Sequence, residues 1–72
     1  MFNREWFTVC TAERDNRDRG YVYARVIART EKKARLATIA KLEQKGYEFI
    51  FVVACFKNRR VKRNEKQEVS LL

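Results

Sequence analysis

Apolar and polar positions along the chain predict two strands joined by a hairpin loop. Residues 6–12 (WFTVCTA) are rich in aromatic and β-branched side chains, as is typical of a strand. Residues 13–20 contain no apolar side chain, and their Asp, Asn and Gly residues suit a turn. Residues 21–29 then alternate, with Val or Ala at each even position from 22 to 28. This alternation predicts a second strand with one small, apolar face.

A helix is predicted directly after the second strand. Thr30 can accept a hydrogen bond from the first turn, and Glu31 places a negative charge at the positive end of the helix dipole. Residues 31–45 are mostly good helix formers, and Gly46 suits the left-handed position that ends a helix.

The apolar residues of this helix form two rows and leave two interpretations open. Either the leucine-containing row is the core, with alanines present for helix propensity, or the alanines lie close on the sheet while the larger row partly faces a second molecule. The rows are Leu36, Ile39 and Leu42 on one side, and Ala34, Ala37 and Ala40 on another.

Eight consecutive apolar residues, 49–56 (FIFVVACF), predict a third strand over residues 47–56 with two apolar faces. A single helix covers only one face of a small sheet, so the other face stays open. The register is ambiguous from the sequence. If Ile50, Val52 and Ala54 join the helix side, the open side has Phe49, Phe51, Val53 and Cys55, whereas the reversed register exposes Ile50, Val52, Ala54 and Phe56.

The predicted fold is therefore α+β, with a small three-stranded, antiparallel or mixed sheet in the order strand–strand–helix–strand. We expect one domain over residues 1–56, with the helix packed on the small apolar face of the second strand. Residues 57–72 are predicted to form a basic C-terminal tail that is flexible or that orders on binding.

Charge is the strongest compositional feature. Seventeen Lys and Arg residues against nine Asp and Glu residues give a net charge of +8. A basic excess of this size favours binding to polyanions. Residues 57–72 carry half of that net charge, which places the strongest attraction at the C-terminal end.

The sequence argues against catalysis and against a bound metal or cofactor. It contains no histidine, two glycines and two cysteines, and both cysteines lie within apolar strands. We expect these thiols to be buried and reduced, with a single cross-strand disulfide as the alternative. The first residues do not form a signal peptide, and the longest apolar run is far shorter than the ~20 residues that span a bilayer. A cytoplasmic protein is expected.

Nucleic-acid binding is the first functional hypothesis. Two tyrosines and two arginines on the odd-numbered face of the second strand combine stacking surfaces with guanidinium groups, as platforms for single-stranded nucleic acid do. The basic run after Phe56 can follow a phosphate backbone. The candidate residues are Tyr21, Tyr23, Arg25, Arg29, Lys57, Arg59, Arg60, Lys62 and Arg63.

Protein binding is the alternative. The open face can be closed by a symmetric homodimer or by a larger partner to whose edge the sheet adds. A Trp/Phe strand, a charged hairpin loop, Ala-Arg-Thr at 28–30, an alanine-rich helix and Gly-Tyr-Glu-Phe at 46–49 follow one another within residues 6–56. This order resembles that of small phage-encoded host-takeover proteins, such as the short phage inhibitor of bacterial RNA polymerase. The resemblance implies a protein that modulates the host's transcription or other nucleic-acid machinery, and it transfers no functional residue.

Overall fold

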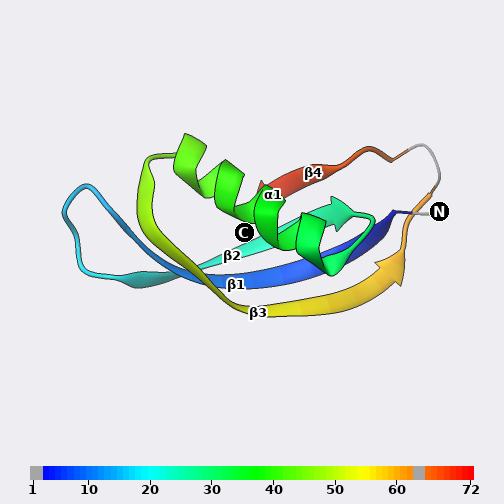
Figure 1. Cartoon of the computed structure of the whole chain (residues 1–72), viewed down its shortest axis with the longest axis horizontal. Coiled ribbons are helices and arrows are strands. Elements are labelled where there is room, and N and C mark those ends of the chain that lie inside the picture. The colour runs from blue at the N-terminus through cyan, green and yellow to red at the C-terminus, as the bar shows by residue number, and fades with distance from the viewer. Residues whose placement is uncertain (1–2, 63–64) are drawn as a thin grey trace.

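The computed structural model describes residues 3–62 and 65–72 and shows an antiparallel four-stranded sheet with a helix on one face (Figure 1). The strands lie side by side in the order β3-β1-β2-β4, so that β3 and β4 form the two edges. The elements are β1 (Arg4–Arg14), β2 (Gly20–Ala28), α1 (Glu31–Gln44), β3 (Tyr47–Arg60) and β4 (Glu68–Leu71).

The α+β class is confirmed, but the expectation of three strands is wrong. The additional strand, β4, lies in the segment that was expected to be a tail, and β3 itself continues past Phe56 to Arg60. β4 pairs antiparallel with β2, and its Val69 and Leu71 pack against the core. Two alternating apolar residues are too few to predict a strand from sequence. It is the free edge of β2 that provides their partner.

Both predicted helix ends are confirmed. The Thr30 hydroxyl accepts a hydrogen bond from the Lys33 N–H at 3.2 Å, which satisfies one donor of the first turn. Gly46 has a φ of 90°, a conformation that side chains with a Cβ rarely adopt. The chain therefore leaves α1 in a tight turn and enters β3 at Tyr47.

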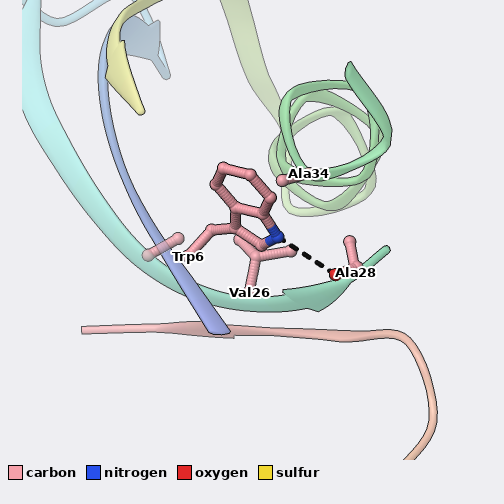
Figure 2. Packing of buried hydrophobic residues seen from close by; sticks show 5 residues of the cluster. Trp6, Val26, Ala28 and Ala34 are labelled. Atoms are coloured by element: carbon pink, nitrogen blue, oxygen red, sulfur yellow. Dashed lines mark hydrogen bonds between the residues drawn. The ribbon is translucent and has the colours of Figure 1, made fainter. Parts of the chain in front are cut away.

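The core lies between α1 and the small face of β2, as predicted. Its centre contains Trp6 from β1, three small residues of β2 (Ala24, Val26 and Ala28) and Ala34 from α1 (Figure 2). Because most of these side chains are short, the helix lies close on the sheet and the indole fills the space beside it. The Trp6 Nε1–H donates a hydrogen bond to the Ala28 carbonyl at 3.0 Å, so its one polar group is satisfied (Figure 2).

The buried row of α1 is neither of the two rows that the sequence pattern suggested. It consists of Ala34, Thr38 and Leu42, all fully buried, whereas Leu36 is 56% exposed. Thr38 donates a hydrogen bond to the Ala34 carbonyl at 2.8 Å, and its hydroxyl lies 3.0 Å from that of Thr8 on β1. A pair of buried hydroxyl groups thus links the helix directly to the central strand.

Both registers predicted for β3 are partly correct, because the strand contains a bulge. Val9 pairs with Ala54 but Cys10 pairs with Val52, which leaves Val53 as an extra residue. The extra residue reverses the alternation of side chains along the strand. Ile50, Val52 and Cys55 consequently lie on the helix side, and Phe51, Ala54 and Phe56 lie on the opposite side.

The Thr8–Thr38 contact yields a stability prediction. Thr38→Val leaves the Thr8 hydroxyl buried without its partner, so we expect the free energy of unfolding to fall by about 1–3 kcal/mol. Thr8→Val/Thr38→Val removes both hydroxyls and should recover part of that loss. Urea unfolding followed by circular dichroism measures both effects. If the double variant loses as much free energy of unfolding as Thr8→Val and Thr38→Val lose together, the two hydroxyls do not interact directly.

Candidate nucleic-acid interface

The side of the sheet that α1 leaves uncovered has aromatic side chains on three adjacent strands. The strand register places its residues in rows that cross β3, β1 and β2. We refer to this surface as the open face. Its three rows are Phe51–Thr11–Tyr21, Ala54–Val9–Tyr23 and Phe56–Phe7–Arg25.

Four aromatic side chains on the open face are well exposed. Tyr21, Tyr23, Phe51 and Phe56 keep 66%, 50%, 62% and 59% of their surface accessible. The rings of Tyr21 and Tyr23 stack on each other, with centroids 6.4 Å apart and an interplanar angle of 26°. The predicted tyrosine pair is therefore present, and the two phenylalanines on β3 extend the aromatic surface across β1 to the sheet edge.

Arg19 is a component of the open face that the sequence analysis missed. It extends from the hairpin loop back across β1, donating hydrogen bonds to the Thr11 hydroxyl at 3.1 Å and to a Glu13 carboxylate oxygen at 3.0 Å. The same guanidinium donates to the Phe49 carbonyl at 2.6 Å and lies 5.2 Å from the centre of the Phe51 ring. The contacts with Phe49 and Phe51 join residues distant in sequence, so the local pattern gives no signal for them.

Glu5 is a second component that the sequence analysis missed. It is a buried carboxylate on β1, 4% exposed, at the end of the open face. It accepts hydrogen bonds from Arg25 Nε and Asn58 Nδ2, and an Arg59 nitrogen lies 3.4 Å from the same carboxylate. Glu5 therefore fixes two predicted binding arginines in place, and it also offsets part of their charge.

The surroundings of Glu5 determine its protonation. Burial alone raises the pKa of this carboxyl, but the hydrogen bonds from Asn58 and Arg25 and the charges of Arg25 and Arg59 outweigh burial. The pKa of Glu5 consequently lies below the ordinary glutamate value. The carboxylate stays ionised at neutral pH and holds both guanidinium groups.

The structure brings together some of the predicted site residues and separates others. Tyr21, Tyr23 and Arg25 share the open face, and Arg59 reaches it through Glu5. The remaining basic residues that the structure describes do not belong to the rows of the open face. Arg29 lies past the end of β2, Lys57 and Arg60 pair with Trp6 and Arg4 and so belong to the helix-side rows, Lys62 is exposed beyond β3, and Arg63 lies outside the described residues.

The two cysteines are free, with Cys10 buried and Cys55 half-buried. Burial raises the pKa of both thiols, and for Cys55 the charge of Glu31 raises it further against the opposing effect of Arg35. Cys55 pairs with Thr8 rather than with Cys10, so the cysteines are not direct cross-strand neighbours. Within residues 3–62 and 65–72, no group of three or more Cys, Asp or Glu side chains could hold a metal ion.

The single helix in the described part of the chain, α1, is too short to cross a membrane. Comparisons of the chain with protein-family models, with curated proteins and with solved structures find no match. The function is therefore inferred from the geometry of the open face.

The Glu5 cluster predicts a specific loss of stability in acid. Because the folded-state pKa lies below the ordinary value of 4.5, the stabilisation from ionised Glu5 is complete above that value and is lost as the pH falls through the folded-state pKa. We expect Glu5→Gln to cost about 1–3 kcal/mol at neutral pH and to lose less stability than the wild type on acidification. Urea unfolding at several pH values measures this. Glu68→Gln, at an exposed site, is the control and should retain the acid sensitivity of the wild type.

Proposed function

We propose that this protein is a non-catalytic module that binds single-stranded nucleic acid on the open face of its sheet. The observation that carries the proposal is the group of four exposed aromatic rings on one uncovered face, with three arginines beside them. Aromatic rings on a sheet give unpaired bases a surface on which to stack, and arginines bind the phosphates between the bases.

The arrangement favours single strands over duplexes. In a duplex the bases are already stacked and paired, so their faces cannot reach side chains on a flat sheet. The exposed rings span three strands, and adjacent strands lie about 4.8 Å apart, so the aromatic surface suits a few successive unstacked bases.

Charge supports the same proposal from the ends of the strands. On the open face itself, Glu5 and Glu13 offset much of the charge of the three arginines. Exposed positive charge instead lies beyond the ends of the strands, at Arg29 after β2 and at Lys62 after β3. We infer that the rings set the preference for single strands, while the surrounding lysines and arginines supply long-range attraction to phosphate.

A binding role also agrees with the chemistry of the side chains. The sequence has no histidine, and the pKa of each cysteine is raised, which disfavours a reactive thiolate at neutral pH. The Glu5 carboxylate is already engaged by three donors, so it is poorly placed to accept a proton from a substrate.

The aromatic surface is tested by Tyr23→Ala. Each stacked base contributes ~1–3 kcal/mol, so we expect binding to weaken by roughly 5- to 150-fold. Tyr47→Ala is the matched control, because this third tyrosine lies under the Arg14 guanidinium, outside the open face. Fluorescence anisotropy with short labelled oligothymidine and oligouridine measures the effect. Urea unfolding checks that both variants remain folded.

Two results would contradict the proposal. One is the absence of any anisotropy change with wild-type protein at low salt. The other is an equal loss of affinity in the Tyr23 and Tyr47 variants. If a partner from a host lysate also stays bound after nuclease treatment, direct binding to a protein of the nucleic-acid machinery, the alternative function, would be favoured.

The surrounding charges are tested separately by Arg29→Gln/Lys62→Gln. These exposed residues are expected to bind phosphate, so the double variant should weaken binding to all sequences about equally. The slope of log affinity against log salt should become shallower by up to about 2, roughly 1 for each phosphate that the variant no longer neutralises. Titrations at several salt concentrations measure this slope. An unchanged slope would show that neither residue contacts a phosphate in the complex.

A further inference from the structure

A bulge at the Glu5 end of the open face brings two consecutive side chains of β3 to one carboxylate. Asn58 and Arg59 both lie opposite the single β1 residue Glu5, because the strand pairing shifts by one residue there. Bulges of this kind re-aim side chains and recur beside functional sites. Arg25 reaches the same carboxylate from β2, on the other side of β1. Two arginines from opposite sides of the central strand therefore meet at Glu5.

Each of these arginines uses only part of its guanidinium group on Glu5. Arg25 donates to the carboxylate through Nε, and its two terminal nitrogens stay accessible and have no hydrogen-bond partner within residues 3–62 and 65–72. Arg59 contacts the carboxylate through one terminal nitrogen at 3.4 Å, and its side chain is 58% exposed. Because a guanidinium group carries five N–H donors in a fixed plane, both arginines keep donors for an acceptor outside the protein.

The acceptor that fits these donors is an anion with several oxygens. Two guanidinium groups against one carboxylate leave an excess of positive charge at this end of the open face. Glu5 itself is buried, so a ligand meets the guanidinium groups and not the carboxylate. A phosphate group combines the negative charge with the oxygen geometry that forked arginine donors bind best.

The exposed rings lie close to this pair of arginines. Tyr23 is two residues from Arg25 on the same face of β2, a spacing of about 7 Å. Phe56 lies in the same row as Arg25, on β3. A phosphate bound between Arg25 and Arg59 would therefore have an aromatic ring on each of two strands beside it, on which the neighbouring bases can stack.

We propose that Arg25 and Arg59 form a discrete binding site for one phosphate of a single-stranded nucleic acid, with Glu5 as the positioning residue that holds both guanidinium groups. This inference rests on the proposed function. It adds that one phosphate is bound at a fixed point, which sets the register of the strand on the rings, while the others are attracted by diffuse charge. Internal and terminal phosphates share the chemistry that the site recognises, and separate probes distinguish them.

Arg25→Lys tests the geometry of the site at constant charge. An ammonium group is a single point charge, so it cannot hold Glu5 and a phosphate together as the forked guanidinium does. We expect binding to short labelled oligothymidine to weaken by roughly tenfold or more. Arg29→Lys, the same exchange at an exposed residue past the end of β2, is the matched control and should bind like the wild type. Equal affinities of the Arg25→Lys variant and the wild type would overturn the site.

Glu5→Gln separates positioning from simple charge, because the two roles predict changes of opposite sign. If Glu5 only repelled the phosphate, its neutralisation would strengthen binding. As a positioning residue it has the reverse effect, so we expect Glu5→Gln to weaken binding although the chain becomes more positive. Fluorescence anisotropy with oligothymidine, on protein that circular dichroism shows to be folded, measures the sign. Tighter binding by the variant would overturn the positioning role.

NMR signals of the arginine Nε–H groups identify the bound group directly, and the signal that Arg25→Lys removes is assigned to Arg25. The probes are the dinucleotide thymidylyl-thymidine, its neutral methylphosphonate analogue and thymidine 5′-phosphate. We expect the charged dinucleotide to shift the Arg25 signal and the neutral analogue to leave it in place. A larger shift with thymidine 5′-phosphate than with the dinucleotide would also support the site and would identify its ligand as a terminal phosphate.

The same titrations separate failure of the phosphate site from failure of the proposed function. If the charged probes shift the ring signals of Tyr23 but not the Nε–H signal of Arg25, the phosphate site is overturned and the aromatic surface stands. If oligothymidine shifts neither signal at low salt, nucleic-acid binding on the open face is overturned, and the phosphate site with it.

Discussion

The close packing of α1 on the small-residue face of the sheet is the contact on which the rest of the structure depends. Ala24, Ala28 and Ala34 let the helix backbone approach the strands, and Trp6 fills the space that the small side chains leave. One helix of this length cannot also cover the other side of the sheet. The same contact that builds the core therefore leaves the open face exposed, and its four exposed aromatic rings take no part in that core.

Two clusters of polar side chains hold the strands together at opposite ends of the open face. Glu5 anchors Arg25, Asn58 and Arg59 at one end, and Arg19 connects the hairpin loop to β3 at the other. Each cluster joins strands through side chains where the backbone ladder is irregular, near the shifts in the β1–β3 register. The aromatic rows lie between them, on a sheet whose two ends are restrained. Such pre-ordering lowers the entropy cost of binding a flexible chain.

The sequence predicted the features that depend on local pattern. The strict alternation from Val22 to Ala28 identified the buried face of β2, and Thr30 and Gly46 marked the helix ends. The features it missed depend on contacts between distant residues. Nothing in the local sequence distinguishes Glu5 from a solvent-exposed glutamate, and β4 forms as a strand by pairing with the edge of β2. The eight-residue apolar run predicted a strand with two apolar faces but did not reveal the bulge within it.

The bulge at Val53 also changes how substitutions along β3 should be interpreted. Just before the bulge, Ile50 and Val52 face the helix, and just after it, Cys55 and Lys57 do. A polar residue would therefore be tolerated at opposite parities on the two sides of the bulge. Deleting Val53 would bring these two segments into phase and exchange the two faces of one of them. The length of this strand, and not only its composition, thus determines which side chains reach the solvent.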